Sequence, residues 1–472
     1  MRYFRRTAVI FFLPAILMAD GMGAEVWLAG DHHVHSRFSV NWNRKVDPPT
    51  PILDVHGAYS VPKNAQMAKQ YGLAWMVTTD HGGRNHAKLN LEQAYPDLLE
   101  ARKVVPELIQ FFGVELNSPG ADHSNIIIPH THDEAQRIYQ LESRFDKVDA
   151  DPADSGSNAT ETMIEALLEM REFAEMPVVF ANHPSRKAEE GEKYGLTIPS
   201  ALRRWNDAAP EIAVGMAGAP GRQANSINPD GSIKPGAARA NYRGQPTRGG
   251  FDRMTAELGG FWDSMLGEGR RWWITANSDS HKNWTDGGKD FWPGEYAKTY
   301  VYADKSHSEI LAALRAGRIF VTTGDLVSEL YVSATSTTGA TAEIGNSLHL
   351  HSGDDVLVTI RARDPASENS HGDLPAVGHI DLIVGDITGV LENANQDRNS
   401  STRVARRFSE SDWTQQGEFL TMTYRLENVD RSFYLRVRGT NTEQLEPDPD
   451  PLGEDPWTDL WFYSNPIFVK FE

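Results

Sequence analysis

Short apolar runs alternate with amphipathic stretches from residue 26 to about residue 324, and this alternation constrains the fold more than any other feature of the chain. Runs of this kind predict strands, and the stretches between them predict helices. Such βα units form a parallel sheet or barrel with helices outside. We predict strands at 26–29, 74–78, 108–114, 124–128, 178–181, 212–216, 272–276 and 299–302. We predict helices at 64–71, 91–104, 161–175, 254–268 and 308–315.

The pattern changes after residue 324. Segments 329–334, 356–363, 379–384, 420–426 and 433–439 alternate apolar with polar residues and are separated by turn residues. This pattern is typical of an antiparallel β-sandwich of immunoglobulin type. We therefore expect an α/β barrel domain at 25–324 and a β-sandwich domain at 325–472. The histidines of the second domain lack strand-end placement and are not expected to bind metal: His349, His351, His371 and His379.

The first 24 residues have the features of a secretory signal peptide. Arg2, Arg5 and Arg6 precede an apolar stretch at 7–18, and small residues then allow cleavage before Glu25. The alternative, a membrane anchor, is disfavoured because the apolar stretch is shorter than the roughly 20 residues that a membrane span needs. We expect a periplasmic or secreted protein with no stable membrane insertion after cleavage.

The composition excludes several classes of protein. The formal net charge of −19 argues against a nucleic-acid backbone as the main partner, which would need a basic surface. The chain has no cysteine, which excludes disulfides, thiol nucleophiles and cysteine-ligated zinc. These observations leave a small-molecule substrate as the expected partner, and they leave the oligomeric state open.

Five motifs rich in histidine and acidic residues each follow a predicted apolar strand. They are GDHHVHS at 30–36, TTDHGG at 78–83, GVEL at 113–116, ANHPSR at 181–186 and NSDSHK at 277–282. The ends of successive strands meet at one mouth in α/β barrels, so these side chains are expected to converge. Imidazole and carboxylate without thiolate suit Zn²⁺, Mn²⁺ or Fe²⁺. The motifs predict a metal-dependent hydrolase with a multinuclear centre.

The spacing within two of the motifs supports shared metal ligation. His33 and His35 are two residues apart on a strand and therefore point to the same face. His32 points to the other face and is expected to pack in the interior. Asp279 and His281 repeat the same spacing at the end of another strand.

The remaining motifs each contribute one expected ligand. His81 is the natural ligand of its motif, and Asp80 is better placed to hydrogen-bond a ligand imidazole. Glu115 is either a salt-bridged structural residue or a bridge between two metal ions. His123 begins a further strand, and His183 precedes a proline at the end of another.

The order of these motifs resembles that of the PHP (polymerase and histidinol phosphatase) superfamily. GMAGAPGRQ at 215–223, GGFWD at 259–263, AGRIFVTTGD at 316–325 and SNPIFV at 464–469 further resemble an exported branch that includes carbaryl-hydrolase-like proteins. The resemblance implies a distorted (β/α)₇ barrel with up to three metal ions at its mouth, followed by a β domain. It covers nearly all of the chain after residue 24.

The resemblance also implies a ligand set. The first ion would be held by His33, His35, Glu115 and Asp279. The second would be held by His81, His281 and one further residue, and the third by Glu115, His123 and His183. The family usually supplies the further ligand shortly after the HxH pair, where this chain has HSRFSVN. We assign His56 from HGAYSVPKN to this position, with Asn41 and Asp54 as competitors.

The expected chemistry is attack by a metal-activated hydroxide, with two or three divalent ions (Zn, Mn or Fe) as cofactors. Glu115, His281 and Arg186 are the predicted catalytic residues. Cationic side chains near the motifs could bind an anionic substrate: Arg84, Arg186, Arg222 and Lys282.

Phosphoesters are the leading substrate class. A carbamate, carboxyl ester or amide is the main alternative, because bound hydroxide attacks either centre. Such a neutral substrate would need an aromatic pocket, for which the candidates are Trp205, Trp262, Trp284 and Trp292. A non-catalytic, metal-bound binding protein is the alternative of another class.

Overall fold

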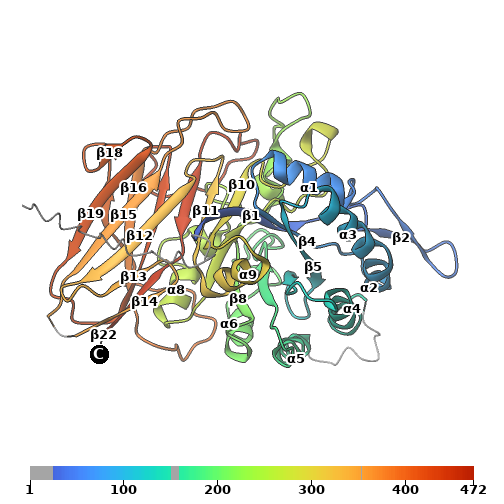
Figure 1. Ribbon diagram of the computed structural model, residues 1–472, viewed down its shortest axis with the longest axis horizontal. Coiled ribbons are helices and arrows are strands. Elements are labelled where there is room, and N and C mark those ends of the chain that lie inside the picture. The colour runs from blue at the N-terminus through green and yellow to red at the C-terminus, as the bar shows by residue number, and fades with distance from the viewer. Residues whose placement is uncertain (1–24, 150–158, 352, 472) are drawn as a thin grey trace, which may run out of the picture.

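A computed structural model describes residues 25–149, 159–351 and 353–471. The predicted signal peptide lies outside the described residues. In Figure 1 the helices gather at one end of an elongated molecule and the C-terminal strands at the other.

Seven strands of one large mixed sheet follow one another in space and carry the five motifs. Their order is β1-β4-β5-β6-β7-β8-β9, and neighbours are parallel except that β6 is antiparallel to both β5 and β7. Their bounds are Val26–Val34, Trp75–Thr78, Ile109–Asn117, His123–Ile127, Val178–Asn182, Ala213–Ala219 and Trp273–Ala276.

The two ends of this run meet again beyond the end of β9. Val34 of β1 forms a parallel bridge with Ser280, and the backbone N–H of His35 donates a 2.9 Å hydrogen bond to the carbonyl of Ser280. The motifs at the ends of β1 and β9 are therefore brought side by side, as the strand-end placement predicts.

Helices lie outside these strands (Figure 1). Ser60 caps α1 by accepting a hydrogen bond from the N–H of Lys63, and a proline stands in its first turn. The helices and single turns are α1 (Val61–Gln70), α2 (His86–Leu89), η1 (Asn90–Ala94), α3 (Tyr95–Val104), α4 (Glu134–Phe145), α5 (Ala159–Arg171), α6 (Pro199–Ala208), η2 (Gln223–Ser226), η3 (Arg239–Asn241), α7 (Arg253–Ala256), α8 (Phe261–Gly267), η4 (Trp284–Asp286) and α9 (His307–Ala316).

The helix predicted at 254–268 is wrong as a single element. It is divided into α7 and α8 by Gly259, whose φ of 70° lies in the left-handed region that only glycine adopts readily. Helices α4 and α6 were not predicted from the sequence. A hairpin of β2 (Asn41–Asn43) and β3 (Thr50–Ile52) projects from the helical end of the molecule in Figure 1.

The large sheet continues directly into the C-terminal region. β10 (Ala297–Ala303) pairs antiparallel with β1, β11 (Ile319–Thr323) pairs with β10, and β11 pairs in turn with β21 (Trp461–Ser464). The same sheet contains β14 (Ser347–Leu350), β16 (His379–Asp386), β17 (Arg403–Phe408), β20 (Phe433–Thr440) and β22 (Ile467–Phe471). A second, separate antiparallel sheet contains β12 (Glu329–Ser336), β13 (Thr341–Glu343), β15 (Val356–Arg363), β18 (Thr414–Gln416) and β19 (Phe419–Leu426).

The coarse prediction of an α/β region followed by a β-rich region is confirmed. The two regions are joined by more than the chain connection. The side chain of Asn465 accepts a hydrogen bond from the backbone N–H of Ile274 in β9 and donates one to its carbonyl. Arg436 also forms a fully buried ion pair with Asp263 of α8, at 2.9 Å. Within the described residues, no helix combines the length and apolar content needed to cross a membrane.

Candidate metal centre

The first group of potential ligands lies at the meeting point of β1, β5 and the segment after β9. Nε2 of His33 lies 2.9 Å from Nε2 of His35 and 3.2 Å from Oε1 of Glu115. Oδ1 of Asp279 lies 3.4 Å from Nε2 of His33 and 3.2 Å from Nε2 of His35. All four side chains are buried. This is the set that the resemblance implied for one ion.

A second group shares the same glutamate. Oε1 of Glu115 lies 3.0 Å from Nδ1 of His123 and 3.2 Å from Nε2 of His183. The other nitrogen of His183 lies 3.1 Å from Oδ2 of Asp122, which the sequence analysis missed. Asp122 directly precedes His123, so this Asp-His pair repeats the Asp-His pair at 80–81 and could have been noticed.

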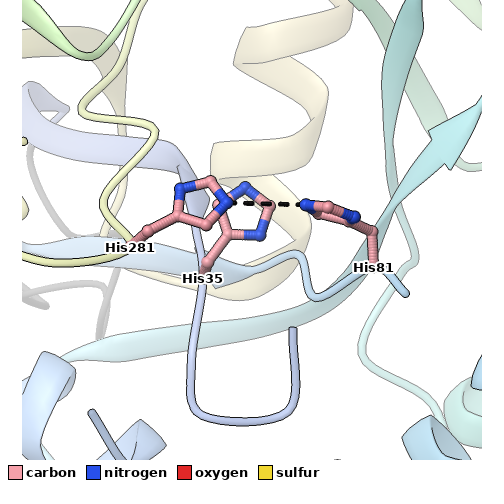
Figure 2. A group of neighbouring side chains, drawn as sticks. All are labelled: His35, His81 and His281. Carbon is pink, nitrogen blue, oxygen red and sulfur yellow. Dashed lines mark hydrogen bonds between the residues drawn. The ribbon is translucent and has the colours of Figure 1, made fainter. Parts of the chain in front are cut away.

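The third group consists of His35, His81 and His281 (Figure 2). Nε2 of His281 lies 3.4 Å from Nε2 of His81, and the rings of His35 and His281 stack with their centroids 3.7 Å apart. The ring of His56 adjoins this group, with centroids 5.0 Å from His81 and 4.7 Å from His281. His35 therefore contributes to two groups, which its assignment to a single ion did not anticipate.

The competitors of His56 lie elsewhere. Asp54 is exposed and pairs with Arg37 at 2.7 Å. Asn41 is exposed at the start of β2.

The geometry of these groups fits divalent cations. Ligand atoms about 2.1 Å from a tetrahedral ion stand roughly 3.4 Å from one another. The separations of 2.9 to 3.4 Å given above are close to this value, and the ligand atoms of each group lie within 4.8 Å of one another. Burial lowers the pKa of His81 well below its usual range, and the neighbouring His35 adds to this effect. The charge of Glu115 acts in the opposite direction but is outweighed. Burial and the neighbouring His35 likewise lower the pKa of His281. Both rings are therefore neutral, as metal ligands must be.

The carboxylates are held in their charged form. Burial alone raises the pKa of Glu115, but the charges of His123 and His33 outweigh burial and bring that pKa well below its usual range. The pKa of Asp279 is also lowered, because Arg222, His33 and Arg186 together outweigh the effect of burial.

Two arginines hold the outer oxygen of Asp279. Nη1 of Arg186 donates to Oδ2 of Asp279 at 2.7 Å, and Nε of Arg222 donates to the same oxygen at 3.2 Å. The other oxygen, Oδ1, is thereby directed at His33 and His35. Of the other predicted anion-binding residues, Lys282 is exposed beside the site, and Arg84 is exposed and does not line the site's cavity.

Two of the proposed ligands and one arginine beside them have a left-handed backbone that is uncommon outside glycine. The φ angles are 29° for His183, 48° for Asp279 and 64° for Arg222. Such conformations cost of the order of 1 kcal/mol or more each and persist where the surroundings enforce them. Here they place two ligands and one of the arginines that hold Asp279.

Two supporting residues were predicted with different success. His32 is buried away from the site between Thr275 and Asn125, as expected, and burial lowers its pKa to about 3. Asp80 acts less directly than predicted. It accepts hydrogen bonds from Ser36 and from the hydroxyl of Ser39, which itself lies 2.9 Å from Nδ1 of His35.

A cavity of about 250 Å³ opens over the three groups. It is lined by His56, His81, Glu115, His123, His183, Arg186, Lys187, Arg222, Asn241 and Asp279. The proposed aromatic wall is wrong. Trp205 and Trp262 are buried in the core. None of the four candidate tryptophans, including Trp284 and Trp292, lines this cavity.

Comparisons with known proteins give little beyond this geometry. No model of a known protein family matches the chain, and no curated protein matches it. Solved structures similar to it include a candidate metal-dependent phosphoesterase from Bifidobacterium adolescentis, with 12% sequence identity over 56% of this chain and 90% of that one, at a TM-score of 0.27. A similarity this low assigns nothing, so the proposal below depends on the site itself.

Proposed function

We propose that this chain is an exported, metal-dependent phosphoesterase of PHP type, with two or three divalent ions at the mouth of a distorted (β/α)₇ barrel. The main support is the position of Glu115. Its Oε1 contacts His33, His123 and His183, while its Oε2 lies 3.4 Å from His35 and 3.6 Å from His81. A carboxylate that touches all three ligand groups is suited to bridging metal ions.

The groups described above would hold the ions, with His56 beside the third group. When bound, such ions supply hydroxide at neutral pH and neutralise charge on the attacked oxygen. The chain's own residues shape the surroundings. Arg186 and Arg222 hold Asp279 in its charged form, and the Nε2 atoms of neutral His81 and His281 lie 3.4 Å from each other.

The cavity lining favours a phosphoester over a neutral carbamate or carboxyl ester. Arg186, Lys187 and Arg222 all line it, whereas no aromatic side chain other than histidine belongs to its described lining. Cationic donors stabilise the charge of a phosphoryl group, and a neutral substrate gains little from them.

The test is metal analysis of the purified protein followed by activity assays with Zn²⁺, Mn²⁺ or Fe²⁺ added back. The substrates are 4-nitrophenyl phosphate, bis(4-nitrophenyl) phosphate and 4-nitrophenyl acetate. We expect metal-dependent turnover of a phosphate ester. Turnover of the acetate alone would support the acyl-hydrolase alternative. A metal-loaded protein that is inactive on all three would support the binding-protein alternative.

Export is proposed from the sequence of residues 1–24. Signal cleavage before Glu25 is tested by N-terminal sequencing of protein recovered from the periplasm or medium.

A further inference from the structure

A second cavity of about 260 Å³ adjoins the metal centre. It is lined by His56, Arg222, His281, Lys282, Gly287, Gly288, Lys289 and Asp290, and it shares His56 and Arg222 with the cavity over the metal ligands. The two cavities therefore adjoin at these two side chains.

Positive charge dominates this second cavity, although the chain as a whole carries 65 acidic and only 46 basic residues. Arg222, Lys282 and Lys289 face one carboxylate, that of Asp290. Oδ2 of Asp290 already accepts 2.9 Å hydrogen bonds from the backbone N–H groups of His281 and Lys282. The lining therefore has an excess of cations over anions.

The two lysines of this cavity have no acidic partner: among the described residues, no carboxylate lies within ion-pair distance of Lys282 or Lys289. Arg222 pairs with Asp279 through Nε, at 3.2 Å. Burial, together with the charges of Arg222, Arg243 and Lys234, lowers the pKa of Lys289, which reflects a positive potential there. Unpaired cations beside a cavity attract an anion.

The segment that carries both lysines is held in place. The backbone N–H of Asn283 donates a hydrogen bond to the hydroxyl of Tyr59 at 3.2 Å, and its side-chain amide donates to Glu295 at 2.9 Å. The N–H of Trp284 donates to the carbonyl of Asp290, also at 2.9 Å. A wall fixed in this way loses little conformational freedom when a ligand binds.

We propose that this second cavity binds an anionic group of the substrate that is separate from the scissile phosphoester, so the preferred substrates carry two acidic groups. This inference rests on the proposed phosphoesterase function. Lys282 and Lys289 act as specificity-determining residues, and Arg222 lies between the two anions.

The test measures binding rather than turnover. Isothermal titration of the metal-loaded protein compares alkylphosphonates with α,ω-alkane diphosphonates of increasing chain length, which cannot be hydrolysed. We expect the best diphosphonate to bind at least about tenfold more tightly than the matching monophosphonate, because a charge-assisted pair is worth more than the 1.4 kcal/mol that a tenfold change requires.

The double variant K282A/K289A should bring this ratio close to one and leave monophosphonate binding largely unchanged, whereas K282R/K289R should keep the preference. The matched control K69A/K103A removes two exposed helix lysines and should change nothing. The second-anion proposal would be overturned if K282A/K289A preferred the diphosphonate as strongly as the unmodified protein does. It would also be overturned if the unmodified protein showed no such preference. Absence of monophosphonate binding would overturn the phosphoesterase proposal, and this inference with it.

Discussion

Nη1 of Arg186 donates a 2.7 Å hydrogen bond to Oδ2 of Asp279, whereas Oδ1 of the same carboxylate faces His33 and His35. The arginine and the ligands thus act on different oxygens of the same carboxylate. Arg186 was predicted as a catalytic residue, and its contact with Asp279 gives it a positioning role as well.

Arg186→Ala should lower metal affinity and turnover by about 10- to 100-fold, the usual cost of losing a partner of a metal ligand. Arg222 still holds the same oxygen in this variant, so the site should weaken rather than collapse. The matched control is Arg84→Ala, which removes an exposed arginine next to the TDHGG motif. Metal content by mass spectrometry and turnover are measured together. Equal losses in both variants would contradict the role of the Asp279 contact.

Chelation should abolish activity and lower thermal stability together. The ligands come from β1, β5, β6 and the segments after β4, β7 and β9, so bound ions stabilise only the folded arrangement. At a free ion concentration about a thousand times Kd, each ion contributes about 4 kcal/mol. The measurement is a melting curve and an activity assay before and after chelation, with metal removal verified. Full activity without metal would disprove the catalytic proposal.

His56→Ala should reduce the metal content by about one ion and cut turnover severely, because its ring adjoins His81 and His281. Asn41→Ala and Asp54→Ala provide matched controls in the same segment and should keep both properties. If Asp54→Ala lost the ion and His56→Ala kept it, the assignment of His56 as the further ligand would be wrong.

Glu115→Gln should cost activity by orders of magnitude, because a neutral amide cannot offset the charge of the cations that it bridges. The paired substitution of His349 and His351 by alanine should change turnover per folded molecule little. Metal content is checked in parallel. A loss from the histidine pair as large as that from Glu115→Gln would mean that the active site extends into the C-terminal region.

The buried pair of His86 and Glu142 should make stability depend on pH. Burial works to lower the pKa of His86, but the charge of Glu142 and their hydrogen bond outweigh it and raise the pKa to about 9, above the ordinary value of about 6.5. The stabilisation by protonated His86 is therefore complete below about pH 6.5 and is lost as the pH rises through about 9.

The check is the unfolding free energy of the natural protein and of His86→Gln between pH 6 and about 10. The difference in unfolding free energy between the natural protein and His86→Gln should be of the order of 2 kcal/mol near pH 6 and should shrink as the pH rises. A difference that stays constant or widens would contradict this prediction.

The local parts of the site could be predicted from sequence, because strand period and strand-end position decide them. The i, i+2 spacing of His33 and His35 and the opposite direction of His32 depend on the backbone of one strand only. The eight strands predicted in the α/β region likewise lie within five residues of their observed ends, whereas β2, β3 and β11 were not predicted.

Features that depend on contacts between distant segments could not be predicted. Nothing in the local sequence pairs Arg186 with Asp279, because the two residues are 93 positions apart. The break at Gly259 was missed because the apolar pattern at 254–268 has helical spacing and does not reveal a left-handed residue. The tryptophans were misplaced for a similar reason, since composition alone cannot distinguish a cavity wall from a core.

The paired hydrogen bonds between Asn465 and Ile274 have a consequence for biosynthesis. A ribosome that has translated residues 1–324 has produced every proposed ligand, yet the amide that pairs with the edge of β9 is still more than a hundred codons away. The strand leading to Asp279 and His281 thus gains this partner only when Asn465 has been made. Premature termination between residues 325 and 464 would leave a full set of proposed ligands without this contact to β9.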